Sequence, residues 1–263
     1  MSSSTPAVRD PAPALTRGIR ILEILADAHG DAVALTDLAR TLDAAKSSTS
    51  NLCAVLEEAG LIRRADTGYV LAHRTAELGG AYVRSFNETR EFYRFCATAP
   101  ALADEVVQFA MLDGSDVVYL ARHEGRSPLR LTANIGDRFP AAPTAVGNAL
   151  LAALPDDEIA RRFGEPGAFP RRTEQSVRNL ADLMTKLELV RERGYAVDEN
   201  EVHPGLSGIA VRMPVRSSSS PPLAIGCTFL SAATSELQRA GILADLRELE
   251  RLLENPLLPA DLR

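Results

Sequence analysis

The chain has 263 residues, of which 46% are hydrophobic and 24% charged, an ordinary composition for a globular protein of two modest domains. We expect no membrane span, because no apolar run approaches ~20 residues, and no secretory signal, because the first residues lack its basic-then-apolar order. Three scattered cysteines without CxxC spacing argue against a zinc ribbon or disulfide framework and favour a reducing, cytoplasmic location. With a net charge of −6 overall, and eight Lys and Arg against nine Asp and Glu in residues 1–75, nucleic-acid binding would depend on where the charges lie.

A polar tail precedes the first predicted helix. Residues 1–14 are rich in Ser, Pro and Ala, which is typical of a disordered tail. The residues that follow predict a helix from Thr16 to about His29, with Gly30 as its stop. Apolar residues at helical spacing mark its expected buried stripe, which comprises Ile19, Leu22, Leu25 and Ala26.

Two arginines, Arg17 and Arg20, lie in the first turns of this helix. Basic side chains at that end oppose the helix dipole, so an external anion such as a phosphate explains their position better. The sequence is equally consistent with two solvated surface arginines.

Residues 35–69 have the pattern of a winged helix-turn-helix, with two short amphipathic segments, a tight turn and a basic hairpin. The first segment opens at Leu35, with Thr36 as the expected N-cap, and residues 43–45 make the turn. The second segment predicts a helix from Lys46 to Ala59. Its expected buried residues are Leu52, Val55, Leu56 and Ala59. We predict a winged domain over residues 15–75, which makes DNA the first partner to consider.

The start of the second helix carries short hydrogen-bonding side chains beside one cation. These residues are Lys46, Ser47, Ser48, Thr49, Ser50 and Asn51. A recognition helix needs such groups at the end that enters the major groove, where Asn can pair with adenine and Ser or Thr can reach bases or phosphates. The alternative is a helix N-terminus that is merely capped, but four Ser and Thr residues in a row exceed what capping requires.

A basic hairpin and a helical stretch follow. Residues 61–71 predict strand, turn and strand, with Asp-Thr-Gly at the tip, and Arg63 and Arg64 are placed to meet phosphates. Residues 76–97 predict a linker helix with aromatic and apolar residues available for packing. We expect it to pack against a second copy of the chain, because dimeric readers bind symmetric half-sites; packing onto the chain's own second domain is the alternative.

Residues 98–254 change to a mixed pattern. Strands are predicted at 105–111, 116–122, 129–134, 195–198, 208–215 and 223–230. Helices are predicted at 144–154, 156–163, 176–193 and 235–253, the last with Ser235 as N-cap. This order favours an α+β domain in which helices cover a sheet. Residues 255–263 are expected to be a tail.

The order of these elements, together with several short motifs, resembles the IclR family of bacterial transcriptional regulators. The motifs are residues 17–22, residues 46–48, residues 56–61, DGSDVVYLARHEG at 113–125, the Gly-Asp turn at 136–140, residues 144–151 and residues 190–196. Each motif alone is weak, and their shared order over residues 15–253 is specific.

The resemblance implies a GAF-like α/β effector-binding domain with a six-stranded antiparallel-type sheet, and a dimer or dimer of dimers on operator DNA. The residues that match the family's effector pocket are Phe139, Thr144, Ala145, Val146, Asp198, Gly208, Cys227 and Phe229. The chain departs from the usual pattern at Ser50-Asn51 in the recognition helix and at Ala142-Pro143, Asn148 and Gly208 near the pocket. These departures put a small carboxylate effector in doubt and favour a bulkier or more apolar one.

The residues offer little support for chemistry beyond binding. Asp198, Glu199, Glu201 and His203 form a polar cluster, but without the ligand spacing of a metal site. Cys227, on an apolar strand, reads as a small core residue, since nothing nearby in the sequence lowers the pKa of its thiol or orients His203 as a base. The GLSG segment at 205–208 lacks the last glycine of a GxSxG elbow. We therefore predict no enzyme activity, no metal and no cofactor.

The main hypothesis is a cytoplasmic transcriptional regulator, a repressor by resemblance, whose DNA binding is controlled by a small molecule in the second domain. Two alternatives remain. One is a regulator that binds DNA without a ligand, its pocket being filled by Phe139 and Phe229. The other is a small-molecule enzyme or sensor whose winged segment only contacts proteins.

Overall fold

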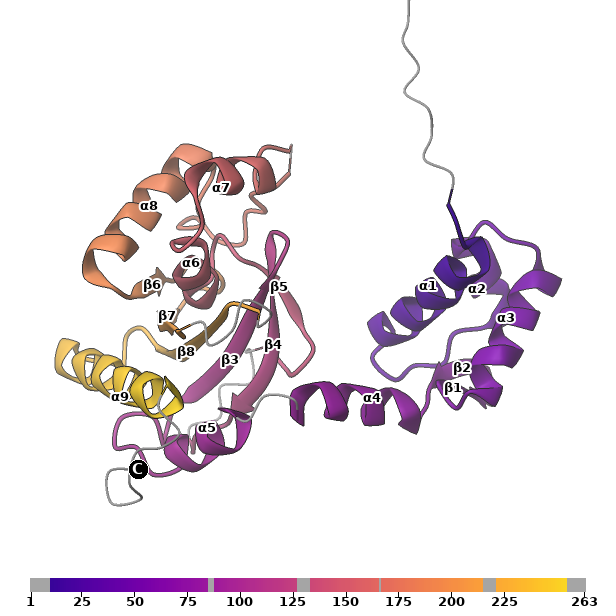
Figure 1. Ribbon diagram of the computed structural model, residues 1–263, viewed down its shortest axis with the longest axis horizontal. Coiled ribbons are helices and arrows are strands. Elements are labelled where there is room, and N and C mark those ends of the chain that lie inside the picture. The colour runs from indigo at the N-terminus through magenta and orange to yellow at the C-terminus, as the bar shows by residue number, and fades with distance from the viewer. Residues whose placement is uncertain (1–9, 85–87, 127–132, 166, 215–220, 255–263) are drawn as a thin grey trace, which may run out of the picture. The chain divides into compact units, whose positions relative to one another are not determined.

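The computed structural model describes residues 10–84, 88–126, 133–165, 167–214 and 221–254. The chain divides into two compact units, Met1–Ser85 and Phe86–Arg263, and each is described by itself (Figure 1). The boundary between the units falls inside the stretch predicted as a linker helix. Among the described helices, none combines the length and the apolar character needed to cross a bilayer.

The first unit is a winged helix-turn-helix (Figure 1). Its elements are α1 (Pro13–Asp27), α2 (Leu35–Thr41), α3 (Lys46–Glu58), β1 (Ile62–Ala65), β2 (Gly68–Leu71) and α4 (His73–Arg84). The core consists of Ile21, Leu25, Leu38, Cys53, Ile62 and Tyr69. One residue or two from each of α1, α2, α3 and the hairpin thus meet in a single small cluster, which orients α3 against the wing.

Several expected details of this unit are wrong. Helix α1 begins at Pro13, inside the predicted tail, because proline suits the first helical turn. Its buried residues are Gly18, Ile21 and Leu25, while Ile19 is 50% exposed and Ala26 is exposed. Val55 is 63% exposed, since it lies two positions, about 200° around the helix, from the buried Cys53. Ala34, and not Thr36, is the N-cap of α2, without a side-chain hydrogen bond.

The wing is held against the loop between α1 and α2. Residues Asp66 and Thr67 make the turn, with Ala65 paired to Gly68. Val33 forms an antiparallel bridge with Tyr69, with N–O distances of 3.0 and 2.9 Å. A Cβ atom at Gly68 would lie 2.2 Å from the Val33 carbonyl oxygen. Gly68 is therefore required by this close approach and not by the turn itself.

The second unit is built on one antiparallel sheet of six strands in the order β5-β4-β3-β8-β7-β6. The strands are β3 (Val106–Asp113), β4 (Asp116–His123), β5 (Arg138–Pro140), β6 (Ala196–Glu199), β7 (Leu206–Arg212) and β8 (Leu223–Leu230). The helices are α5 (Glu88–Cys96), α6 (Ala145–Leu151), α7 (Asp156–Arg162), α8 (Leu180–Arg193) and α9 (Glu236–Glu254).

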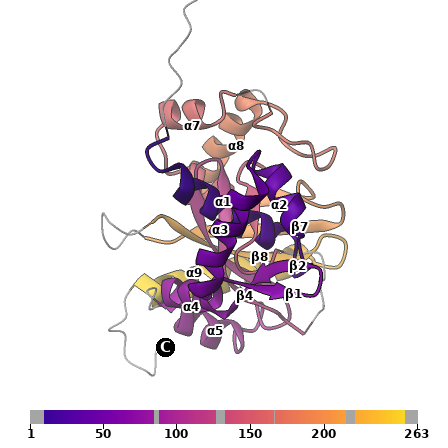
Figure 2. The ribbon, with the colours of Figure 1, turned by 90° about the vertical axis from the view of Figure 1, so that its right-hand side faces the viewer.

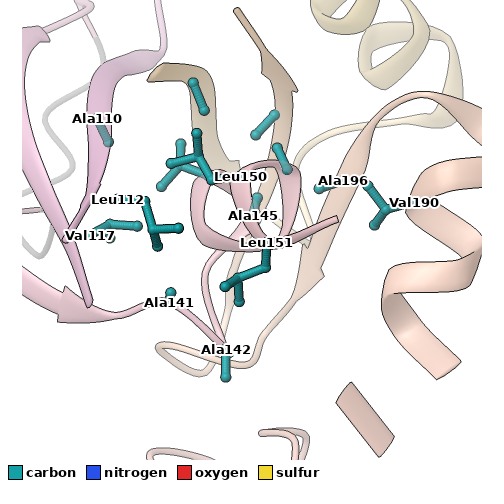
Figure 3. Close-up of a cluster of buried hydrophobic side chains, with 14 of the residues drawn as sticks. Ala110, Leu112, Val117, Ala141, Ala142, Ala145, Leu150, Leu151, Val190 and Ala196 are labelled. Carbon is teal, nitrogen blue, oxygen red and sulfur yellow. The ribbon is translucent and has the colours of Figure 1, made fainter. Parts of the chain in front are cut away.

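Helices cover both faces of this sheet (Figures 1 and 2). On one face α5 and α9 pack against the strands through large apolar side chains, which include Phe92 of α5, Phe109 of β3 and Leu246 of α9. On the other face α6 packs directly on the sheet, and α8 packs on α6. Alanines line the contact of α6 with the strands (Figure 3), and a Cβ atom at Gly226 would lie 2.6 Å from Val146 Cγ1. Small residues therefore allow α6 to approach the strands closely.

Most predicted elements of this unit are present, with shifted ends. The predicted strand 129–134 lies largely outside the described residues, and the edge strand β5 occupies residues 138–140, which the resemblance placed in a turn. Helix α8 begins at Leu180, capped by Asn179, because the Ser176 hydroxyl instead donates to the Glu201 carbonyl at 2.7 Å. Ser235 and Gln238 form the expected cap of α9. The predicted tail 255–263 is outside the described residues.

Candidate DNA-binding face and effector cavity

The exposed face of α3 carries the predicted recognition residues, with one exception. Lys46, Ser47 and Asn51 are exposed, and Ser48 and Ser50 are half-buried. Thr49 is fully buried, and its hydroxyl donates to the Ala45 carbonyl at 3.2 Å. Its assignment to DNA binding is therefore wrong, because the side chain lies on the inward side of the helix.

Sequence reasoning missed one exposed position on this face. Ala54 follows Ser47, Ser50 and Asn51 at helical spacing and is exposed. Because the alanine side chain has no polar atom, nothing in the sequence marked this residue as part of a DNA-binding face. A methyl group on a recognition helix can contact the methyl group of thymine.

The predicted phosphate-binding arginines differ in how they are held. Arg63 and Arg17 are exposed. Arg64 Nε lies 3.4 Å from Glu57 Oε2, and its guanidinium is 5.3 Å from the centre of the Tyr69 ring. Arg20 Nη1 lies 2.8 Å from Glu23 Oε2, and this hydrogen bond raises the pKa of Arg20. Arg64 and Arg20 are thus oriented by neighbouring carboxylates at the surface.

A cavity of about 60 Å³ lies in the second unit, between the sheet and the start of α6. Seven of the eight residues predicted for the pocket line it, namely Phe139, Thr144, Ala145, Val146, Asp198, Gly208 and Cys227. Since one water molecule needs ~10–15 Å³ by this measure, the cavity has room for roughly four to six waters. It is small for the bulkier effector that the sequence departures favour.

Two residues of β8 do not present side chains to the cavity. Phe229 is fully buried in the opposite core, where the Arg239 guanidinium lies 5.2 Å from its ring centre. The assignment of Phe229 to the pocket is wrong, because alternate residues of a strand face opposite sides of the sheet. The Cys227 side chain belongs to the same opposite core, so this residue meets the cavity through its backbone. Burial raises the pKa of the Cys227 thiol well above its ordinary value, which keeps it protonated.

Sequence reasoning did not assign four polar residues to the cavity. They are Gln108 on β3, Tyr119 on β4, Thr228 on β8 and His203 in the loop after β6. Gln108 Nε2 donates to the Ala133 carbonyl at 3.4 Å, and the Thr228 hydroxyl donates to Gln108 Oε1 at 3.3 Å. The available signal was a glutamine in the middle of the apolar run VVQFAM, which a buried strand does not carry without a partner.

Asp198 brings a buried carboxyl group to the cavity, with 7% of the residue exposed. Its Oδ1 atom accepts a hydrogen bond from the Glu201 backbone N–H at 2.7 Å. Burial raises the pKa of the carboxyl to about 7, against the opposing effects of that hydrogen bond and of the Lys186 charge. Lys186 itself pairs with Glu201.

The wall next to α6 is fixed by hydrogen bonds. Thr144 caps α6, its hydroxyl accepting from the Gly147 N–H at 3.1 Å. Asn148, which is fully buried, donates through Nδ2 to the carbonyls of Thr144 and Ala142 at 2.7 and 3.1 Å. The side chain at this departure from the family pattern therefore braces the loop that enters the helix.

Comparison with known families matches both units. Residues 14–66 match the IclR helix-turn-helix domain, and residues 86–253 match the C-terminal domain of the bacterial transcriptional regulator IclR. The chain belongs to the IclR family of bacterial transcriptional regulators. Its winged unit and its six-stranded domain are the two parts of an IclR-type regulator.

Individual proteins of known sequence or structure also resemble this chain. The HTH-type transcriptional repressor AllR of Salmonella typhimurium LT2 is 30% identical over 207 residues, which cover 78% of this chain and 75% of that protein. A transcriptional regulator from Rhodococcus sp. RHA1 superposes with a TM-score of 0.76 at 26% identity, over 92% and 96% of the two chains. An IclR homologue from Microbacterium hydrocarbonoxydans, crystallised with 4-hydroxybenzoate, shares the fold at a TM-score of 0.77 and 22% identity, over 92% and 97%.

Proposed function

We propose that this IclR-type regulator is a cytoplasmic repressor that binds operator DNA through its winged unit, and that a small molecule in the cavity of the second unit controls the binding. The observation that carries the proposal is a cavity containing a buried ionisable group, in the same chain as a helix-turn-helix with an exposed polar face. Repression is supported by the relation to AllR. Effector binding is supported by the Microbacterium homologue, which was crystallised with 4-hydroxybenzoate.

In this proposal the N-terminal half of α3 reads bases and arginines hold phosphates. The proposed reading residues are Lys46, Ser47, Ser48, Ser50 and Asn51, without Thr49. The exposed amide of Asn51 can pair with adenine in the major groove. The phosphate contacts are assigned to Arg17, Arg20, Arg63 and Arg64, which fix the position of the helix on the duplex.

We further propose that the regulator acts as a dimer or a dimer of dimers. Leu15 and Ile19 lie four residues apart on α1 and are 65% and 50% exposed, and Leu78 and Tyr82 have the same spacing on α4, with 57% and 46% exposed. Apolar pairs at this spacing share one face of a helix, and exposed apolar faces mark interaction sites. A second copy of the chain would cover them and supply the second recognition helix of a palindromic operator.

Fluorescence anisotropy on the promoter beside the gene tests the DNA face. At about 0.15 M salt, where screening is physiological, the combined change Asn51→Ala with Arg63→Ala should weaken binding by at least tenfold, because it removes a base contact and a phosphate contact. The control Arg161→Ala also removes one positive charge, but at a surface ion pair of α7 in the other unit, and should leave affinity unchanged. Equal affinity of the double variant and the wild type would show that the DNA face is assigned wrongly.

The two alternatives find less support. Phe229 does not fill the pocket, and the cavity retains about 60 Å³ beside Phe139, so a ligand-independent regulator is the weaker reading. An enzyme would need an activated nucleophile, and the Cys227 thiol both faces the opposite core and has a raised pKa. No catalytic role therefore forms part of the proposal.

A further inference from the structure

Polar groups from four strands meet in the effector cavity. Gln108, Tyr119, Asp198 and Thr228 come from β3, β4, β6 and β8, on the face of the sheet that α6 covers. Phe139, Val146 and Leu206 are apolar parts of the lining. A concave site with a few convergent polar groups among apolar ones fixes the orientation of a small ligand.

One carboxylate oxygen in this set has no hydrogen-bond partner among the described residues. Asp198 Oδ1 accepts from the Glu201 N–H, while within the described ranges Oδ2 makes no hydrogen bond or ion pair. Buried carboxylate oxygens normally have partners, and 93% of this residue is buried. Asp198 Oδ2 is therefore placed to accept a hydrogen bond from a molecule in the cavity.

A donor lies near this acceptor. The Tyr119 side chain is 5% exposed and meets the Phe139 ring edge to face, with centroids 6.0 Å apart. The pKa of the Tyr119 hydroxyl is raised first by burial and then by the Asp198 carboxylate, so the hydroxyl remains a donor at every pH of interest. A donor and an acceptor that line the same cavity match a ligand that itself contains both kinds of group, such as a primary amide or a hydroxyl-carbonyl pair.

Charge in the cavity disfavours anions. A carboxylate bound next to Asp198 would place two like charges at short range, which forces one of them to take up a proton. Two nearby cations are held by other groups and do not offset this repulsion. Lys186 pairs with Glu201, and Arg172 lies over the Phe139 ring at 4.7 Å without lining the cavity. His203 lines the cavity half-buried, with Nδ1 2.8 Å from the Pro204 carbonyl oxygen.

We infer that the cavity selects a small uncharged effector that carries an N–H or O–H donor beside a hydrogen-bond acceptor, such as an amide, in preference to the matching carboxylate. This inference rests on the proposed function and names the ligand class of the same cavity. Asp198 Oδ2 accepts from the ligand, the Tyr119 hydroxyl donates to it, and the cavity volume of about 60 Å³ favours a small molecule.

The experiment compares matched probes on the full chain. Acetamide with acetate, propionamide with propionate, and lactamide with lactate are titrated by ligand-observed NMR at pH 8, which is above the Asp198 pKa of about 7, so that this carboxyl is mostly ionised. In at least one pair the amide should bind about tenfold more tightly than the carboxylate, since that ratio corresponds to about 1.4 kcal/mol. Either of two results overturns the inference. In one, the carboxylate binds more tightly than the amide in every pair. In the other, no probe has a dissociation constant below ~10 mM, which corresponds to a binding free energy of about −2.7 kcal/mol.

Two variants attribute the preference to these side chains. Asp198→Asn removes the charge and keeps the shape, so the preference for the amide should fall to within about twofold. Tyr119→Phe should weaken both members of a pair, because it removes the donor and leaves the carboxylate at Asp198 in place. A preference that survives unchanged in Asp198→Asn contradicts the inference. Cooperative thermal unfolding and retained DNA binding show that each variant is folded.

Failure here is distinguishable from failure of the proposed function. If the carboxylates bind better and still change DNA affinity, the regulator is effector-controlled and only the ligand class is wrong. If the combined Asn51→Ala, Arg63→Ala variant binds DNA as well as wild type, the proposed function fails at the DNA face, whatever the probes do.

Discussion

At the scale of single residues, burial decides which polar side chains matter. Asp198 is held in the interior with one oxygen satisfied, and its ionised form is disfavoured because burial removes water from the charge. Thr49 shows the reverse case. Its hydroxyl is satisfied inside the helix by the Ala45 carbonyl, so it contributes to folding and not to recognition.

The buried Asp198 predicts a specific pH dependence of stability. Its pKa is about 7 in the folded chain and near 4 when unfolded, so between these values the folded state binds the extra proton. The free energy of unfolding therefore falls as pH rises from about 4 to about 7. The stability of Asp198→Asn relative to the wild type should therefore rise between pH 5 and pH 8, by up to ~3 kcal/mol, because about two pKa units of the shift lie in that range. Urea unfolding at both pH values measures the difference.

A matched control separates this effect from the titration of other acidic groups. Glu174 is exposed, and Glu174→Gln also removes one carboxylate, so its stability should follow the wild type at both pH values. The difference in the free energy of unfolding between Asp198→Asn and the wild type should be larger at pH 8 than at pH 5. If it is the same at both pH values, the carboxyl is not the buried, proton-binding group described above.

The sequence predicted site residues where a local pattern marks them, but not where tertiary packing determines the direction of the side chain. The Lys46–Asn51 run stands out in the sequence because polar residues cluster at one helix end. Which of them face outward depends on the register of α3 against Cys53, and the sequence reading made the same kind of error at Val55. Gln108 and Tyr119 could not be assigned to a cavity, because only the pairing of β3, β4 and β8 brings them together.

At the scale of elements, the wing depends on a contact with the loop before α2. The Val33–Tyr69 bridge adds a short third strand segment to the hairpin. Gly68 permits it, because any side chain would strike the Val33 carbonyl. The Asp-Thr-Gly sequence predicted the hairpin tip, but no local pattern could show that a residue 35 positions earlier approaches the glycine.

This contact predicts the behaviour of Gly68→Ala. The new Cβ atom cannot fit 2.2 Å from the Val33 carbonyl oxygen, so the bridge should open and the wing should detach from the loop. Hydrogen–deuterium exchange of the Val33 and Tyr69 amides should accelerate at least tenfold, as expected for a loss of local stability of ~1.4 kcal/mol or more. DNA affinity should fall with it, since Arg63 and Arg64 lie on β1.

Gly18→Ala is the companion change. No atom lies within 4 Å of a Cβ built at Gly18 in α1, and alanine favours helix over glycine by ~1 kcal/mol. This variant should keep slow exchange at Val33 and Tyr69 and should not lower the stability of the unit. If both amides exchange as slowly in Gly68→Ala as in Gly18→Ala, the role given to the bridge is wrong.

At the scale of the whole molecule, the charge is unfavourable for DNA binding and the local basic groups must overcome it. The net charge of −6 repels a polyanion. The two-unit organisation and five of the six strands of the sheet followed from the order of elements, because periodicity and turn residues mark them along the chain, while the number of six strands in one sheet was implied by the family resemblance. The edge strand β5 was not predicted, since three residues are too few to show alternation.

Salt dependence of operator binding measures the phosphate contacts. Each neutralised phosphate contributes about −0.9 to the slope of log K against log salt, so Arg63→Ala in a dimer should reduce the slope by about 1.8. Arg161→Ala should leave it unchanged, because this residue pairs with Asp157 on α7. A slope for Arg63→Ala equal to that of the wild type would remove Arg63 from the phosphate contacts.

The close packing of α6 on the sheet limits how effector preference can diverge among descendants of this sequence. A Cβ at Gly147 would lie 2.1 Å from the Ala141 carbonyl oxygen, and one at Gly208 would lie 3.3 Å from the Ala145 methyl. A side chain at Gly147 would disrupt the packing of α6, whereas one at Gly208 would fit only if the Ala145 methyl moved by a few tenths of an ångström. Mutational drift toward a new effector is therefore easier through Gln108, Tyr119, Asp198 and Thr228, where a change of functional group costs little volume.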